Sequence, residues 1–300
     1  MAIFSMTELM KGAQEGGYAV GYFESWNLES TKAVVGAAEE MHSPVIIGFN
    51  GGILTDKKRI LKPEDLEIYG CFGRKLAEDA SVPVALLLNE IESLSLAVLG
   101  MKYGFNALMF ESEGEDLEGD ILQVRSIVEI AHEGGVAVES NVGVLPSAER
   151  VRHGKQKHLL TSVRDARRFV EGTGVDALGV SIGNIEVLME GKAQLDFSLL
   201  EEIHAAVEVP LTLHGGSGIA DKDVPALIAR GVCKMNLGAA LNAAFMDGMK
   251  KAMDRNRNQV SPKYAIGSGL DVDVTAHAEN AMKELVKHKI TVYGSAMKAL

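Results

Sequence analysis

Eight short runs of β-forming apolar residues recur along this chain of 300 residues, and segments with helical periodicity separate most of them. The runs cover residues 18–24, 44–50, 83–90, 107–112, 136–141, 177–183, 210–215 and 232–238. The clearest helical segments cover 27–41, 63–80, 119–135 and 162–174. A strand followed by a helix, repeated eight times, predicts an α/β fold of the closed (β/α)8 TIM-barrel type.

A doubly wound open sheet is the rival architecture. It gives no reason for eight evenly repeated units, and no glycine-rich phosphate-binding fingerprint follows the first run. Because no linker or low-complexity segment divides the chain, we expect a single barrel domain over residues 1–300. Residues from about 241 to 300 are mainly helical and are expected to form the last barrel helix and a C-terminal extension.

Composition excludes several classes of function. With 47% hydrophobic and 24% charged residues, the chain is typical of a soluble globular protein, and its net charge of −11 lacks the basic footprint of a nucleic-acid or anionic-membrane binder. Cys71 and Cys233 have no CxxC spacing, so neither a disulfide framework nor a cysteine metal site is expected. The absence of a signal-like N-terminus and of long apolar runs predicts a cytoplasmic protein.

In a (β/α)8 barrel the chemistry lies where strands end and the following loops begin. Polar residues at these positions are Glu24, Asn50, Asn89, Glu90, Glu111, Glu139, Asn141, Asn184, Glu186, His214 and Asn236. The predicted mouth of the barrel is therefore rich in carboxylates.

The motif LHGGSG (213–218) is the sharpest local signal. A histidine ends the seventh run, and a glycine and serine loop follows that can present backbone N–H groups and a hydroxyl to an anion. Gly238 and the small residues after it open a helix at the end of the eighth run, where barrels favour phosphate sites. The simpler interpretation of GGSG is a tight turn.

His214, Glu90 and Glu186 form a credible three-ligand site for Zn, Mn or Fe. Clustering favours this interpretation, because crowded carboxylates raise one another's pKa unless a cation lies among them. Alternatively, the glutamates are solvated residues of the rim, the histidine is structural, and no metal is bound.

The sequence resembles the class II, metal-dependent ketose-bisphosphate aldolases, a family of fructose- and tagatose-bisphosphate aldolases. The resemblance runs from about Thr7 to about Asn258. It is carried by segments 16–29, 37–49, 77–86, 166–183, 195–203, 209–218 and 231–245, which include GGYAVGYF, VPLTLHGGSG and GVCKMNLGAALNAAF. It implies a TIM barrel with aldehyde-lyase activity in carbohydrate metabolism, a divalent metal, and a homodimer or homotetramer.

The resemblance also implies where the metal binds. The Leu-Asp-His segment that carries the family's catalytic aspartate and a zinc histidine here reads Leu88, Asn89, Glu90. A second zinc histidine corresponds to Glu186, and the third is retained as His214. Replacement of both histidines by carboxylates favours an altered metal site, with a preference shifted toward Mn, Fe or Mg.

The catalytic positions change in a similar way. In the family the metal polarises the substrate ketone while the aspartate handles a proton at the aldehyde oxygen. Asn89 cannot transfer that proton, but it can donate a hydrogen bond. Glu139 matches an acidic position of the family. The family has a second acidic residue two positions later, where this chain has Asn141. Asn89 and Glu139 are the catalytic candidates.

The expected phosphate and substrate contacts are partly retained. Gly215 and Ser217 match the phosphate-loop positions, and Asn236 matches a substrate-contacting asparagine. The residues that depart from the family pattern are Gly238, Ala239, Glu24 and Asn50. The pocket is therefore expected to bind a phosphorylated substrate with a changed lining.

The leading hypothesis is a lyase that performs aldol cleavage or condensation on a phosphorylated ketose or related keto compound. One alternative is a sugar-phosphate binding protein that has lost aldolase chemistry. Another is a metal-free lyase with a Schiff-base lysine at Lys234, which lies two residues before Asn236 on the same strand.

Overall fold

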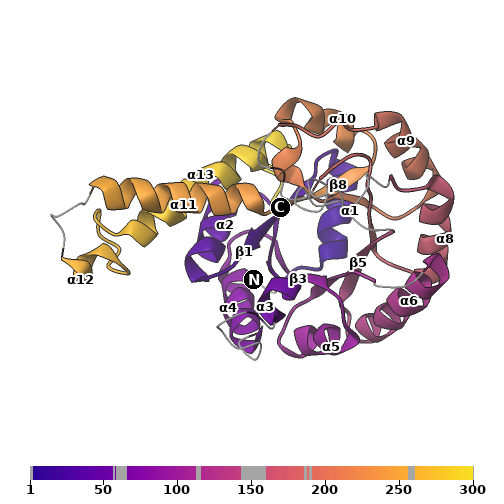
Figure 1. Ribbon diagram of the computed structural model, residues 1–300, viewed down its shortest axis with the longest axis horizontal. Coiled ribbons are helices and arrows are strands. Elements are labelled where there is room, and N and C mark those ends of the chain that lie inside the picture. Colours follow the sequence, from indigo (N-terminus) through magenta and orange to yellow (C-terminus); the bar gives the residue numbers. More distant parts are fainter. Residues whose placement is uncertain are drawn as a thin grey trace.

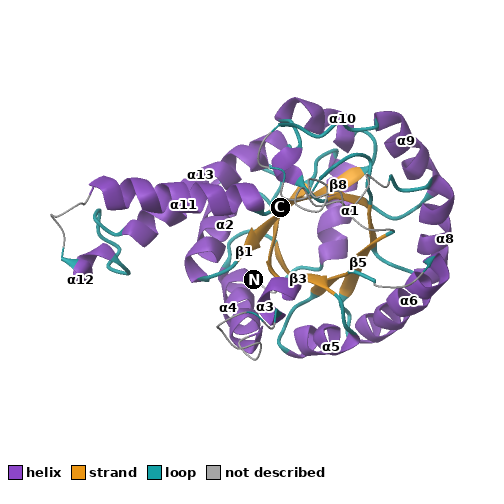
Figure 2. Cartoon of the chain, viewed as in Figure 1, coloured by secondary structure: helices purple, strands orange, loops and turns teal. Residues whose placement is uncertain are grey.

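The computed structural model contains eight parallel strands that close into a barrel in chain order, with helices around the outside (Figures 1 and 2). The strands are β1 (Val20–Ser25), β2 (Val45–Asn50), β3 (Val84–Ile91), β4 (Ala107–Phe110), β5 (Ala137–Asn141), β6 (Ala177–Gly179), β7 (Leu211–Leu213) and β8 (Val232–Leu237). The structure describes residues 3–56, 58, 66–112, 116–142, 160–185, 188, 191–255 and 261–299. The predicted (β/α)8 fold is confirmed.

The described helices alternate with the strands and add a C-terminal group. They are α1 (Met6–Gly16), α2 (Leu28–Glu40), α3 (Gly51–Thr55), α4 (Leu66–Asp79), α5 (Leu94–Lys102), α6 (Leu117–Glu133), α8 (Val163–Thr173), α9 (Phe197–Ala206), α10 (Val224–Ile228), α11 (Ala239–Arg255), α12 (Pro262–Ala265) and α13 (Val274–Val292). Most begin at a side-chain cap; Asn27 and Ser30, for example, form a reciprocal capping box at α2.

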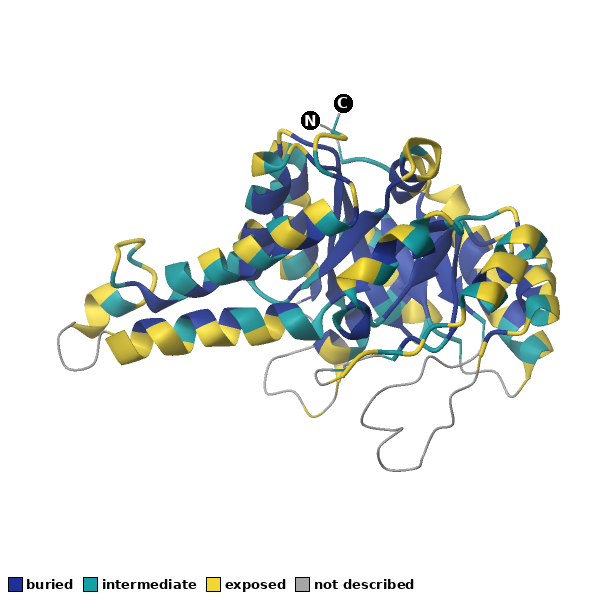
Figure 3. Cartoon of the chain, turned by 90° about the horizontal axis from the view of Figure 1, so that it is seen from above, coloured by how far each residue is buried: buried dark blue, intermediate teal, exposed yellow. Residues whose placement is uncertain are grey.

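Successive residues of each strand face opposite sides of the barrel wall, which creates two separate apolar clusters. One cluster fills the barrel interior with strand residues such as Ile46 and Leu87, and Met6 and Met10 of α1 belong to it. The other lies between the outer wall and the surrounding helices. Helix α1 therefore packs on the interior cluster. Figure 3 shows that the strands of the barrel wall are largely buried.

Strands β6 and β7 end before their apolar runs do. β6 ends at Gly179 and β7 at Leu213, whereas the runs continue to residues 183 and 215. Beyond β6, side-chain oxygens accept the backbone hydrogen bonds that a neighbouring strand would otherwise accept. Ser181 N–H donates to Thr161 Oγ1 at 2.8 Å, and Ile182 N–H donates to Asn184 Oδ1 at 2.9 Å. The apolar pattern continues because the segment is buried, although its hydrogen bonds are no longer those of a sheet.

The C-terminal helices form an arm that extends from the barrel (Figures 1 and 3). Helices α11 and α13 lie side by side, with α12 between them in sequence at the far end of the arm. Gly248 allows the close approach, because a Cβ there would lie 2.7 Å from Ala281 Cβ and 2.8 Å from the His277 carbonyl oxygen. Among the described residues, none of the helices combines the length and the apolar character that a membrane span requires.

Candidate active site

A pocket of about 480 Å³ opens at the carboxyl ends of the strands. Its lining includes most of the residues that the sequence predicted for the site: Glu24, Asn50, Asn89, Glu90, His214, Gly215, Ser217, Asn236, Gly238 and Ala239. The barrel therefore brings together residues that are up to 215 positions apart, as from Glu24 to Ala239, because parallel strands end at the same rim. Glu186 lies outside the described residues.

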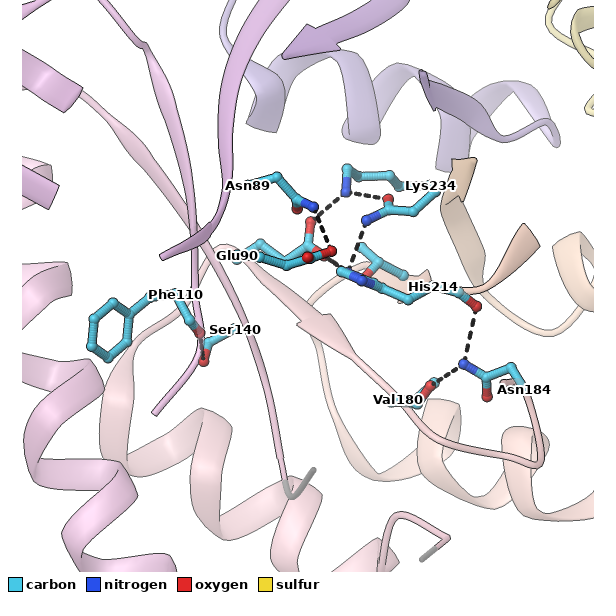
Figure 4. Close-up of polar contacts among 11 residues, drawn as sticks. Asn89, Glu90, Phe110, Ser140, Val180, Asn184, His214 and Lys234 are labelled. Atoms are coloured by element: carbon cyan, nitrogen blue, oxygen red, sulfur yellow. Dashed lines mark hydrogen bonds and ion pairs between the residues drawn. The ribbon is translucent and has the colours of Figure 1, made fainter. Parts of the chain in front are cut away.

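Glu139 is fully buried and is not among the residues that line the pocket, but it lies at the centre of a polar network. His214 and Lys234 of this network are labelled in Figure 4. Glu139 Oε1 accepts a hydrogen bond from Thr212 Oγ1 and lies near His214 Nε2, each at 2.9 Å, while Oε2 lies 2.8 Å from Lys234 Nζ. Lys234 Nζ also donates to Asn236 Oδ1 at 2.5 Å. Strands β5, β7 and β8 are thus joined through side chains inside the barrel.

The charges of this network stabilise one another. Burial opposes ionisation of Glu139, but the Lys234 ammonium and His214 outweigh it and lower the pKa of Glu139 to about 2. The pKa of Lys234 is lowered, because burial outweighs the attraction of Glu139. Both side chains are fully buried, so Lys234 is a paired structural ammonium here, which disfavours its use as a free nucleophilic amine.

His214 makes two contacts through one ring nitrogen. Nε2 lies 2.9 Å from Glu139 Oε1 and 2.9 Å from Asn236 Nδ2. Only one of these can be a good hydrogen bond at a time, and ionised Glu139 favours an Nε2 that carries the proton. Because Nε2 is committed to a carboxylate, His214 would bind a metal through Nδ1. Metal-ligating histidines usually donate their other ring N–H to a partner of this kind.

Glu90 has an uncommon backbone conformation at the rim. Its φ is 54°, in the left-handed region, where the β3 to β4 register shifts between Leu88 and Ile91. Asn89 Nδ2 donates to Glu90 Oε1 at 2.8 Å, and Asn50 Nδ2 donates to Glu90 Oε2. Two amides from adjacent strands therefore hold the two oxygens of one carboxylate.

The loop after His214 and the start of α11 form the opposite wall. Gly215 has a φ of 74°, and a Cβ on Gly216 would lie 2.6 Å from the Asn236 carbonyl oxygen. Ser217 Oγ accepts a hydrogen bond from Ala240 N–H at 3.0 Å, which ties the loop to the first turn of α11. Backbone N–H groups and a helix N-terminus thus border the pocket, an arrangement suited to an anion.

Several pocket residues were missed by the sequence analysis, among them Tyr22, Asp56 and Glu92. Tyr22 precedes Glu24 by two residues and so shares its inward face, which is a signal that strand alternation offers. Its hydroxyl is buried without a hydrogen-bond partner among the described residues. Burial, and then Glu24, Glu90 and Glu139, raise the pKa of Tyr22 well above its ordinary value, so the hydroxyl stays neutral.

Two further residues of the predicted mouth, Asn184 and Glu111, have different places in the structure. Asn184 Nδ2 donates to the carbonyl oxygens of Val180 and His214, at 3.2 and 3.1 Å, and so links the segment after β6 to the end of β7 (Figure 4). Glu111, in contrast, lines the pocket. Among the described residues, the carboxylates that line the pocket therefore come from β1 to β4 and the segments that follow these strands.

The chemistry of the donors fits a divalent metal. Glu90 is oriented by two amides and His214 by a buried carboxylate, and such contacts are typical of metal ligands. Within the described ranges no three His, Cys, Asp or Glu side chains form a ligand group. The third predicted ligand, Glu186, belongs to the part of the chain without a description.

Comparisons with known proteins identify one family. The family described as fructose-bisphosphate aldolase class II matches residues 4–298. A sulfofructosephosphate aldolase of Alkalicoccus urumqiensis is 29% identical over 300 residues, covering 100% of this chain and 99% of that protein. A fructose-bisphosphate aldolase of Thermus caldophilus is 31% identical over 316 residues, covering 97% and 98%.

Solved structures show the same likeness. The crystal structure of the YdjI aldolase from Escherichia coli K12 superimposes with a TM-score of 0.80 at 30% identity, covering 99% of this chain and 100% of that one. The match extends over the barrel and the C-terminal arm alike. Sequence and fold therefore agree that this chain belongs to the class II fructose-bisphosphate aldolase family.

Proposed function

We propose that this protein is a metal-dependent aldolase that cleaves or forms a carbon–carbon bond of a phosphorylated ketose. The observation that carries the proposal is the convergence of His214, Glu90 and the Gly215–Ser217 loop on one pocket, where an imidazole, a carboxylate and a glycine-rich loop line the same space. Family membership supports the reaction class.

The loop and the start of α11 bind the phosphate. Ser217 Oγ already accepts from Ala240 N–H, so its own proton is directed to an acceptor such as a phosphate oxygen. Gly215 and Gly216 let the backbone approach the anion closely, and Gly238 and Ala239 place the first turn of α11 beside it. Asn236, held by Lys234, lines the same pocket.

Glu90, Glu186 and His214 would hold the divalent metal, which supplies Lewis-acid polarisation of the substrate ketone. Glu139 acts through His214, whose ring it orients from below the pocket. Asn89 contributes hydrogen bonding and not proton transfer, because an amide does not titrate. Oxygen-rich ligation favours Mn or Fe over Zn at this site.

We also propose a cytoplasmic homo-oligomer, a dimer or tetramer. The arm formed by α11, α12 and α13 exposes large apolar side chains, as in Met246, Met253, Tyr264, Ile266 and Leu270. Apolar side chains gathered on one projecting element are typical of an association surface. Light scattering of the purified chain measures the subunit number directly.

The test is metal content together with cleavage of a substrate panel. Elemental mass spectrometry of the untagged protein should find one metal per chain, lost in Glu90→Ala, Glu186→Ala and His214→Ala. The metal-loaded protein should release a triose phosphate from a ketose phosphate, for example fructose bisphosphate or sulfofructose phosphate. A protein that binds phosphosugars but takes up no Mn, Fe or Zn would instead be a binding protein without aldol chemistry.

A further inference from the structure

The strongest unassigned feature is the hydrogen-bonded group of Asn50, Asn89 and Glu90 at the ends of β2 and β3, which we call the amide clamp. Asn50 and Asn89 are register partners on neighbouring strands, so their side chains emerge side by side. Each gives its amide Nδ2 to a different oxygen of Glu90. All three residues line the pocket.

Other contacts fix which end of the Asn50 amide faces Glu90. Asn50 Oδ1 accepts a hydrogen bond from Ile53 N–H at 2.9 Å and caps α3, which leaves Nδ2 for the carboxylate. For Asn89, the opposite orientation would place Oδ1 against a carboxylate oxygen and would repel it. Both amides are therefore donors to Glu90.

The surrounding backbone is shaped to hold Glu90 in place. Glu90 is a non-glycine residue at a φ of 54°, a strained conformation that persists only where the surroundings enforce it. A Cβ on Gly51 would lie 2.3 Å from Ile91 Cγ2, and one on Gly52 would lie 3.2 Å from the Glu90 carbonyl oxygen. Two glycines thus allow the start of α3 to pack directly on the clamped segment.

The charges explain why the neighbours of Glu90 are amides. An aspartate at either position would place a second negative charge beside Glu90 and would remove a donor. An asparagine supplies the donor without the charge. Asn89 donates to Glu90 although its own Oδ1 is buried without a hydrogen-bond partner among the described residues, which carries a desolvation cost.

We infer that Asn50 and Asn89 are positioning residues that act through Glu90, holding its carboxylate in the orientation in which it binds the metal. This inference rests on the proposed function, because it takes Glu90 as a ligand. The three residues form one functional unit, in which both asparagines act through their contacts with the Glu90 carboxylate. Loss of either amide weakens the site without removing a ligand.

The experiment measures Mn²⁺ binding to the metal-free full-length protein by calorimetry, so that activity is not needed. Asn50→Ser keeps a side chain that can cap α3 but has no amide, and Asn89→Ala removes the second donor. Each should weaken Mn²⁺ binding about 10- to 100-fold, the usual effect of losing a hydrogen-bond partner of a ligand. The fold decrease in Mn²⁺ affinity of the double variant should be smaller than the product of the two single fold decreases, because both asparagines act on one carboxylate.

Two reference variants complete the design. Glu90→Ala gives the effect of losing the ligand itself, and Asn280→Ala removes an exposed amide of α13 and should bind as the parent does. If both asparagine variants bind within about twofold of the parent while Glu90→Ala does not bind, the positioning role is wrong. Unchanged thermal unfolding of the variants shows that weak binding is not misfolding.

Different results would contradict the proposed function and the positioning role of the amide clamp. If the parent binds no Mn²⁺, the metal site is wrong and the clamp cannot serve a ligand. If the parent binds Mn²⁺ and Glu90→Ala binds equally well, the metal site stands without Glu90, and the inference is overturned alone.

Discussion

Lys234 Nζ lies 2.8 Å from Glu139 Oε2 inside the barrel, and both side chains are fully buried. The pair joins β8 to β5 beneath the pocket, and through Glu139 it reaches His214. A buried charge of this kind is tolerated only with its partner, because an unpaired ion in the interior is strongly destabilising.

Breaking this pair should lower stability more than removing it altogether. Glu139→Gln leaves the Lys234 ammonium without its counter-charge and should cost about 3–5 kcal/mol of unfolding free energy; Lys234→Met should cost a similar amount. The double variant Glu139→Gln, Lys234→Met should lose clearly less than the sum, because it leaves no unpaired buried charge. Urea denaturation of the four proteins tests this, and additive losses would contradict the pairing.

The N-cap of α13 should make stability depend on acid pH. Burial opposes ionisation of Asp273, but hydrogen bonds from Gly269 N–H and from Thr275 outweigh it and lower the pKa of Asp273. The stabilisation is therefore complete above the ordinary pKa of 3.8 and is lost as the pH falls through the lower, folded-state pKa. Asp273→Ala should cost about 1 kcal/mol at pH 6 and progressively less below pH 3.8.

Thermal unfolding of Asp273→Ala and the parent from pH 6 down to pH 3 measures this difference. Ser162→Ala is the matched control, because Ser162 caps α8 with a hydroxyl that does not titrate in this range. Its loss of stability should be the same at every pH. A constant difference for Asp273→Ala as well would show that the carboxylate is not held ionised by the cap.

Tyr22→Phe should not destabilise the protein. The Tyr22 hydroxyl is buried without a hydrogen-bond partner among the described residues, so its removal relieves a desolvation cost of about 1 kcal/mol while the ring keeps its packing. The melting temperature should be unchanged or higher, whereas Tyr264→Phe, at an exposed position, should change nothing. A marked loss of stability in Tyr22→Phe would mean that the hydroxyl has a partner in solution.

Gly216→Ala should weaken binding of a phosphorylated ligand. A Cβ at this position would lie 2.6 Å from the Asn236 carbonyl oxygen, so the loop must shift away from β8. Titration with dihydroxyacetone phosphate should show an affinity lower by at least about 10-fold, because the loop's donors are displaced from the anion. Gly12→Ala in α1, whose nearest contact would be 3.5 Å, should leave this affinity unchanged.

Much of the site could be predicted because strand alternation is a local property. Side chains two residues apart share a face, so the polar residue at the end of each apolar run points to the barrel mouth. Glu24, Asn89 and Asn236 were identified in this way, and all three line the pocket. The same rule would have identified Tyr22. It was missed because an aromatic residue in an apolar run is usually a residue of the hydrophobic core.

The sequence by itself determined the eight-stranded barrel, the rim that carries the polar residues and the loop of the LHGGSG motif, because each depends on short-range periodicity and turn chemistry. Only the tertiary structure decided which of these polar groups pair. The Asn50 contact with Glu90 spans 40 positions and the Lys234 contact with Glu139 spans 95, and such pairings depend on barrel closure and strand register. The sequence therefore identified most residues of the site, and the register and closure of the barrel determined which of them pair.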